Sequence, residues 1–332
     1  MKIISFNSYK GGACRTTTCY NTLPYLAKIL GATAQQPILV FDIDLDSMGL
    51  TSIFRPDYGK TAKPLAYSAR NLFVDDSEGI NDRLRKGFLS SVRDQWYFGP
   101  EHFQRVGNDL GLEDNESVLF CGADENAGTI SDDDFRSYKE NPPLQTLIME
   151  LESLDEEEQP KAIVFDCASG VQMSTIAALS FVQHVVVCMR PTLQFRLGTY
   201  DYLCKKIPNE IRKAKDNTRR EVILLPTSVA SNKISESDPN YDQAIDELDR
   251  LRKRTKNRIT QEIVDDLQKK DERILGYTLN SQMAELDDFG LPEIERFKWQ
   301  EFLLYKEEAL TESEKHLKKK YEQLAEILAR EV

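Results

Sequence analysis

The sequence contains no run of apolar residues approaching the ~20 that a helix needs to cross a bilayer, so we expect no transmembrane segment. Its first apolar run is short and leads straight into a glycine-containing loop, which is not the pattern of a signal peptide. The six cysteines form no C-x-x-C pair, which argues against a metal or iron–sulfur site and favours reduced thiols. Together these features predict a cytoplasmic protein.

An excess of positive charge is also lacking. The chain has 43 Lys and Arg against 55 Asp and Glu, a formal net charge of −12, so its surface as a whole does not attract nucleic acid. Lys and Arg nevertheless concentrate in two basic clusters, in residues 205–220 and 250–258. Basic and acidic residues interleave there at helical spacing, which favours a solvated, ion-paired surface. Nonspecific DNA binding by these clusters is the alternative.

Apolar runs recur along the chain with helical patterns between them, which is typical of a parallel sheet. Several runs are continuous, as in strands that helices cover on both faces. The predicted strands are 2–7, 37–41, 117–121, 162–165, 184–189, 222–225 and 274–279. Helical periodicity marks 16–30, 144–154, 197–214, 241–270 and 312–330. We therefore predict an α/β fold with a doubly wound, mostly parallel sheet flanked by helices.

The chain shows no internal repeat or low-complexity linker, so we predict one domain over residues 1–332. Residues 52–115 are too long and too mixed in polarity for a simple connection, and we expect an inserted helical elaboration there. Residues 241–270 are too polar for a deeply buried crossover, which predicts a charged helical appendage. The C-terminal helix, 312–330, carries acidic residues and few bulky apolar ones, so we expect it to pack on the domain and not on a membrane surface.

A glycine-containing loop joins the first predicted strand to the first predicted helix. Backbone N–H groups of such a loop, together with the positive end of a helix dipole, bind phosphate, and a hydroxyl at the helix start can contact Mg²⁺. The segment reads Asn7-Ser8-Tyr9-Lys10-Gly11-Gly12-Ala13-Cys14-Arg15-Thr16-Thr17-Thr18. Its composition and position predict a phosphate-binding loop.

The segment resembles the deviant Walker A motif of the ParA/MinD family of P-loop NTPases, Lys-Gly-Gly-x-Gly-Lys-Thr-Thr, including the extra lysine at its front, Lys10. The resemblance implies that ATP and Mg²⁺ bind here, with Thr16 on the metal and Thr17 on the α-phosphate. It also implies a homodimer in which Lys10 reaches the partner's phosphates. The implied nucleotide-binding residues are Gly11, Gly12, Ala13, Cys14, Arg15, Thr16 and Thr17. The alternatives are a solvated loop lysine and threonines that only cap the helix.

Two residues depart from that motif. Cys14 stands in place of a glycine, and in a tight turn it faces a backbone conformation that only glycine reaches without steric cost. Arg15 stands in place of the phosphate-binding lysine, as it does in a subset of the family. Its guanidinium keeps the positive charge and can donate two hydrogen bonds to phosphate oxygens, but it is bulkier than an ammonium. We therefore expect nucleotide binding and do not predict efficient hydrolysis.

Two further segments end apolar runs with aspartates, as the family's other motifs do. Asp42 and Asp44 lie in Leu39-Val40-Phe41-Asp42-Ile43-Asp44, and by resemblance Asp44 orients the attacking water with support from Asp42. Asp166 ends Ala162-Ile163-Val164-Phe165-Asp166 and resembles a Walker B aspartate that places Mg²⁺ opposite Thr16. Gly170 follows in a loop that lacks the family's usual prolines, and its N–H is expected near the γ-phosphate. Carboxylates that merely end strands are the alternative.

The ordered matches continue to about residue 292, and among them Pro226 and Thr227 resemble the strand end that meets adenine. The resemblance therefore implies an Mg·ATP-dependent, dimerising switch with slow ATPase activity, in which Lys10 and Asp44 are the catalytic residues. The altered motifs leave open a catalytically impaired nucleotide-sensing scaffold in a multi-protein assembly. A DNA- or cargo-positioning partition factor is a third interpretation.

Overall fold

An eight-stranded sheet forms the centre of the molecule, and all but one of its strands run parallel. The computed structural model describes residues 1–55, 68–73, 103–115, 117–123, 143–213, 219–229, 258–270, 275–284, 290–293 and 302–331. The strand order is β3-β4-β2-β5-β1-β6-β7-β8. The strands are β1 (Lys2–Ser8), β2 (Ile38–Ile43), β3 (Gln104–Arg105), β4 (Val118–Cys121), β5 (Ala162–Ser169), β6 (His184–Met189), β7 (Glu221–Pro226) and β8 (Thr278–Asn280). The predicted doubly wound α/β fold is confirmed.

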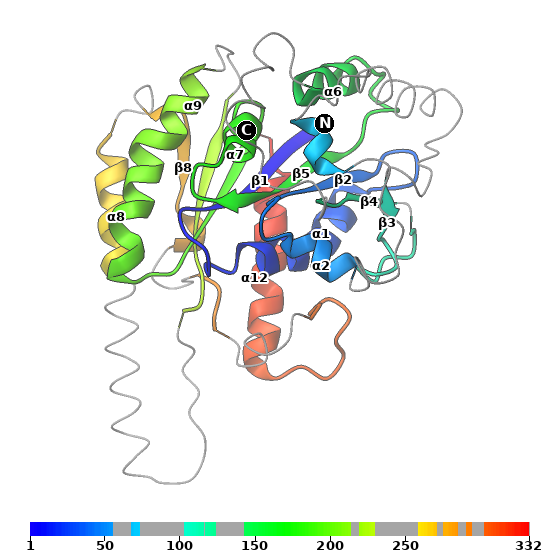
Figure 1. Ribbon diagram of the computed structural model, residues 1–332. Coiled ribbons are helices and arrows are strands. Elements are labelled where there is room, and N and C mark those ends of the chain that lie inside the picture. The colour runs from blue at the N-terminus through cyan, green and yellow to red at the C-terminus, as the bar shows by residue number, and fades with distance from the viewer. Residues whose placement is uncertain are drawn as a thin grey trace.

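Helices cover both faces of this sheet (Figure 1). The labelled α-helices of the described residues are α1 (Arg15–Leu30), α2 (Gly49–Phe54), α6 (Pro143–Glu152), α7 (Met173–Leu179), α8 (Leu193–Asp201), α9 (Ile207–Lys213) and α12 (Glu312–Ala329), and residues 258–268 are also helical. A π-helical segment, Tyr202–Lys206, joins α8 to α9. Short 3-10 turns lie at Ala69–Leu72 and Gln282–Ala284.

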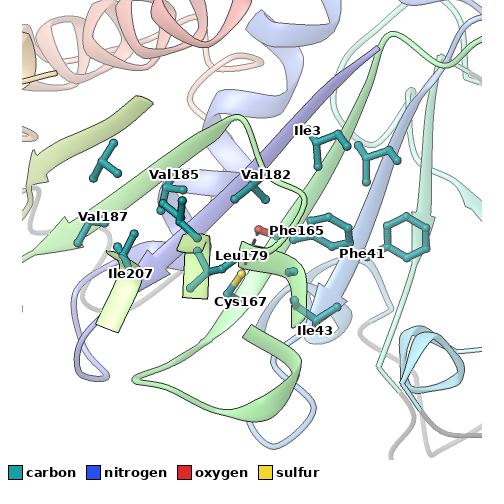
Figure 2. Close-up of a cluster of buried hydrophobic side chains, with 14 of the residues drawn as sticks. Ile3, Phe41, Ile43, Phe165, Cys167, Leu179, Val182, Val185, Val187 and Ile207 are labelled. Carbon is teal, nitrogen blue, oxygen red and sulfur yellow. Dashed lines mark hydrogen bonds between the residues drawn. The ribbon is translucent and has the colours of Figure 1, made fainter. Parts of the chain in front are cut away.

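Successive residues of the central strands supply two hydrophobic cores, one on each face. In β5, Phe165 and Cys167 contribute to one core and Val164 to the other. Figure 2 shows the first core, where the rings of Phe41 and Phe165 stack with centroids 5.7 Å apart. Because both faces are covered, nearly every residue of these strands is buried, and this explains their continuous apolar sequences.

The C-terminal helix packs on the domain, as predicted. α12 lies against α1 and contributes Leu317, Leu324 and Leu328 to the second core. Its start is fixed by a capping box, in which the Thr311 side chain accepts from the Glu314 backbone while the Glu314 carboxylate accepts from Thr311. None of the helices in the described part of the chain is long and apolar enough to cross a membrane.

Two predicted peripheral segments are described only in part. Of the predicted elaboration, residues 56–67 and 74–102 lie outside the described residues, and the rest includes the end of α2, a 3-10 turn and β3. β3 pairs antiparallel with β4 at the edge of the sheet. Of the predicted appendage, 241–257 lies outside the described residues. Residues 258–268 are helical and bury Ile259, Ile263, Val264 and Leu267 in the first core, so this end covers the sheet.

The last predicted strand begins later than expected. Residues 274–279 were predicted, whereas β8 spans Thr278–Asn280. Gly276 has a φ of +73°, a left-handed conformation that turns the chain just before the strand. An apolar run alone does not reveal such a turn.

Candidate nucleotide-binding site

The three predicted motifs lie on three neighbouring strands at the centre of the sheet. Their order is β2-β5-β1, and Asp166 of β5 pairs in register with Asp42 on one side and Phe6 on the other. Because the strands are parallel, the segments that follow them emerge at the same edge, where open α/β sheets bind ligands. The topology therefore brings together the glycine loop, the two aspartates after β2 and the Walker B-like segment.

The glycine loop leaves β1 at the surface and returns into α1. Lys10, Gly11 and Gly12 are exposed, and a Cβ added to either glycine would meet no atom within 4 Å. Gly12 has a φ of +79°, which glycine adopts without strain. The loop thus presents open backbone of the kind that binds phosphate.

Cys14 adopts the left-handed conformation that its place in the turn predicted. Its φ is 54° and its ψ 27°, and it forms the N-cap of α1, with its carbonyl accepting from Thr18 N at 2.9 Å. Its Sγ lies 3.2 Å from the hydroxyl of Ser228, itself a residue with positive φ. A left-handed backbone conformation costs a residue with a side chain about 1–2 kcal/mol. Cys14 therefore adopts a strained conformation that a glycine would adopt at lower cost.

Arg15 points its guanidinium into the sheet edge and joins the two other motifs. Its Nε donates to Asp166 Oδ1 at 2.7 Å, and its Nη2 donates to Asp44 Oδ2 at 2.6 Å. The same Nη2 lies 3.2 Å from the Thr16 hydroxyl. The three charged side chains are 8 %, 6 % and 0 % exposed for Arg15, Asp44 and Asp166. They form a buried, charge-assisted ion-pair network.

Thr16 and Asp166 lie together as the predicted metal site requires. The Thr16 hydroxyl donates to Asp166 Oδ2 at 2.7 Å, so a hydroxyl oxygen and a carboxylate converge on one place. Mg²⁺ takes one or two carboxylates from the protein and its other ligands from phosphates and water, so these residues fit it. In the described parts of the chain, no group of three or more His, Cys, Asp or Glu side chains is arranged to hold a metal.

Asp42 and Asp44 occupy different environments. Asp42 is fully buried, and its Oδ2 accepts from the Thr51 backbone and from the Thr51 hydroxyl, both at 2.8 Å. Its Oδ1 accepts from Asp44 N at 3.2 Å, so Asp42 supports the turn that carries Asp44. The other oxygen of Asp44, Oδ1, accepts from Ser47 N at 3.2 Å. Thr51 was not predicted, although it directly follows Gly-Leu in the second motif.

Burial and neighbouring charges shift the pKa values of these groups. Burial lowers the pKa of the Arg15 guanidinium, but the negative charges of Asp166 and Asp44 outweigh this effect and the net shift is upward. Burial, followed by repulsion from Asp166, raises the pKa of Asp42 to about 7, against the opposing hydrogen bonds from Thr51. Burial also raises the pKa of Asp166, although the charge of Arg15 opposes it. The Arg15 cation therefore favours the charged form of Asp166 against the effect of burial.

Gly170 and the end of β7 complete the surroundings of the loop. Gly170 has a φ of +81°, and its N–H donates to Ser8 O at 2.8 Å, so a phosphate would have to replace that bond. Pro226 ends β7, and the hydroxyl of the next residue, Thr227, donates to Ala13 O at 2.9 Å. The segment predicted to meet adenine therefore lies directly against the glycine loop.

A contact between the loop and α8 was not predicted. The ring of Tyr9 rests on Gly198, and a Cβ at that glycine would overlap the ring. Sequence reasoning could not find this pair, because nothing in either segment indicates the other.

The basic clusters are described only in part, and two of the described members form ion pairs. Lys205 pairs with Asp201 at 2.6 Å, and Arg258 pairs with Glu262 at 3.2 Å. Residues 214–218 and 250–257 lie outside the described residues. These two pairs are contacts of the kind expected for an ion-paired surface, whereas Arg212 and Arg220 donate to the backbone carbonyls of Pro208 and Ser180.

The chain has the α/β fold of the ParA-like P-loop NTPases. An ATP complex of a McdA variant from Cyanothece matches with a TM-score of 0.53 and 15 % identity, covering 100 % of this chain and 98 % of that one. The ParA of pNOB8 matches with a TM-score of 0.53 and 12 % identity, covering 99 % and 97 %. The property shared with these structures is the fold. No protein-family model matches the sequence, and no curated protein sequence matches it.

Proposed function

We propose that this protein binds Mg·ATP at the glycine loop, forms a homodimer around it, and acts as a switch that hydrolyses ATP slowly. The observation that carries the proposal is the convergence of Arg15, Thr16, Asp44 and Asp166 directly behind the exposed loop. Phosphoryl transfer in P-loop NTPases depends on positioning and on charge stabilisation around the phosphates. These side chains supply a cation, a hydroxyl and two carboxylates for that purpose.

Each residue has a distinct role in this proposal. The backbone N–H groups of the loop and Arg15 would hold the β- and γ-phosphates, with Thr17 at the α-phosphate and the end of β7 beside the base. Thr16 and Asp166 would hold Mg²⁺, which when bound neutralises developing phosphate charge. Asp44, fixed by its neighbour Asp42, would orient the attacking water.

The proposed dimer is supported by an apolar surface beside the loop. Large apolar side chains are exposed in the loop after β1, in the loop after β5, and on α7 and α8: Tyr9, Val171, Met173, Leu193 and Leu197. Lys10 is exposed next to them, where it could reach a partner's phosphates. A self-complementary patch around a shared ligand is the arrangement that a two-fold dimer needs.

Calorimetric titration of ATP into the full chain with Mg²⁺ tests the proposal. Micromolar binding is the expected result, since the loop is open and its cation, hydroxyl and carboxylates are in place. Absence of heat at two temperatures would overturn the proposal, because a binding enthalpy that vanishes at one temperature does not vanish at the other.

A nucleotide-sensing scaffold without turnover is the second candidate. It is favoured by the ion pairs of Arg15, which hold both the water-orienting and the metal-binding carboxylates in one network. ATP binding at micromolar affinity without steady-state phosphate release would support this candidate over the slow ATPase.

A further inference from the structure

We infer that Arg15 is the resident cation of the Asp44–Asp166 carboxylate pair, and that a divalent metal enters this place only when Arg15 leaves it for a nucleotide phosphate. The inference deepens the proposed function and rests on it for the identity of the phosphate ligand. It assigns to Arg15 a second position and a second role, besides the phosphate contact that the motif implies.

The geometry places the guanidinium among the three groups that the metal and its water would use. Nε bonds to Asp166 Oδ1 at 2.7 Å, and Nη2 bonds to Asp44 Oδ2 at 2.6 Å. Nη2 also lies 3.2 Å from the hydroxyl of Thr16. One side chain therefore contacts the hydroxyl and both carboxylates, and a metal ion at this place would meet two positively charged N–H groups.

The charge and burial of the network explain why the cation must be exchanged and cannot simply be removed. Asp166 has no exposed side-chain surface, and Asp44 has 6 %. Removing one partner of a buried ion pair leaves an uncompensated charge and is strongly destabilising. Arg15 can therefore move to a phosphate only if another cation takes its place between the carboxylates.

The chemistry of arginine is what permits this arrangement. A guanidinium is a planar fork with several donors, so two of its nitrogens can reach two carboxylates at once. A lysine ammonium is a point charge on a flexible stem and lacks that fork. The replacement of the motif's lysine by Arg15 thus creates a bridge between the second and third motifs.

Coupled binding of metal and nucleotide follows from the exchange. Without nucleotide, the Arg15 guanidinium occupies the position that Mg²⁺ would bind. Without Mg²⁺, a nucleotide that binds Arg15 would leave Asp44 and Asp166 without a counter-ion. Each ligand therefore raises the affinity for the other by the same factor, as linkage requires.

The first test uses the full chain without any nucleotide. Thermal unfolding is recorded in EDTA and in millimolar Mg²⁺ for the wild type, for Arg15→Met and for Arg196→Met. The last is a matched control, because Arg196 also pairs with a carboxylate, Glu262 at 2.7 Å, but on the surface. We expect Mg²⁺ to leave the wild type and Arg196→Met unchanged and to raise the unfolding temperature of Arg15→Met by about 2 °C or more.

Two further variants sharpen this test. Adding Asp166→Asn to Arg15→Met should abolish the rise, because the metal then loses its carboxylate. If Arg15→Met does not fold, Arg15→Lys takes its place, and the same Mg²⁺-dependent rise is expected because the ammonium lacks the fork. An equal effect of Mg²⁺ on the wild type and on the Arg15 variant would overturn the inference.

The second test uses the wild type and separates the inference from the proposed function. ATP is titrated by calorimetry in Mg²⁺ and in EDTA, and we expect affinity to fall at least tenfold without the metal. Equal affinity in both buffers would contradict the exchange. Absence of ATP binding in both would refute the proposed function, while the nucleotide-free test would still decide whether Arg15 holds the metal's place.

Discussion

At the residue scale, Asp44 is the carboxylate that we propose orients the attacking water. Oδ2 is bound to Arg15 and Oδ1 to the Ser47 N–H, so the group is held at the edge of the site. We predict that Asp44→Ala lowers steady-state phosphate release by about 10²-fold or more, as the loss of a general base does.

The neighbouring carboxylate provides the control for this experiment. Asp46 lies two residues further on, is exposed, and accepts from Gln172 at 3.0 Å. Asp46→Ala should keep the parental rate. An Asp44→Ala variant as active as the parent would remove Asp44 from the mechanism.

Cys14 offers a test of backbone strain in the loop. Its φ of 54° penalises any residue with a Cβ. We predict that Cys14→Gly is more stable than Cys14→Ala by about 1 kcal/mol, because both variants lose the sulfur and only the glycine relieves the strain. Urea unfolding of the two variants measures the difference. A Cys14→Ala variant equal in stability to Cys14→Gly would show that the turn relaxes without cost.

Single residues also show how far the site could be predicted. The motifs predicted that Thr16 and Asp166 meet, and the structure brings them to 2.7 Å because β1 and β5 are neighbours. The inward position of Arg15 was not predicted, since the motif directs this side chain toward phosphate. Which anion a long side chain meets depends on buried charges that become neighbours only after folding.

At the element scale, the predictable parts of the fold are those with a strong local signal. β5 and β6 were found because both are continuous apolar runs, which is the pattern of strands covered on two faces. β3 was missed because two residues of an antiparallel edge strand carry no pattern. The π-helical segment after α8 was missed as well, because its residues continue a helical periodicity.

The contact between the glycine loop and α8 gives a prediction at this scale. Gly198→Ala should strengthen α8 locally, since alanine favours helix, yet its Cβ would displace the Tyr9 ring and with it the loop. We predict that ATP affinity falls by about tenfold, or about 1.4 kcal/mol, which lies within the roughly 1–3 kcal/mol cost of overpacking. Calorimetric titration measures it.

A compensating variant distinguishes this contact from a general effect on the helix. In the double variant Tyr9→Ala with Gly198→Ala, the ring is gone, and with it the three atoms nearest to the added methyl group. Affinity should return close to that of Tyr9→Ala alone. If the double variant binds as weakly as Gly198→Ala, the loss does not arise from the ring.

At the scale of the whole molecule, the sheet places the exposed apolar side chains and the glycine loop on neighbouring segments. The loops after β1 and β5 and the helix after β6 follow adjacent strands in the order β5-β1-β6. A ligand in the glycine loop would therefore lie beside Leu193 and Leu197, which are 70 % and 77 % exposed. Such side chains remain in water in a monomer and leave it when a second copy covers them.

This arrangement predicts that dimerisation depends on both ATP and α8. Leu197→Asp should abolish the ATP-dependent increase in mass measured by sedimentation velocity, because a carboxylate would be buried at the interface without a partner. Met149→Asp is the matched control: Met149 is 59 % exposed on α6, which follows β4 near the other end of the sheet. We expect that variant to dimerise like the parent. Loss of the dimer in both variants would indicate a general effect of added negative charge on a chain that already carries a net charge of −12. Dimerisation of Leu197→Asp at the parental ATP concentration would exclude α8 from the interface.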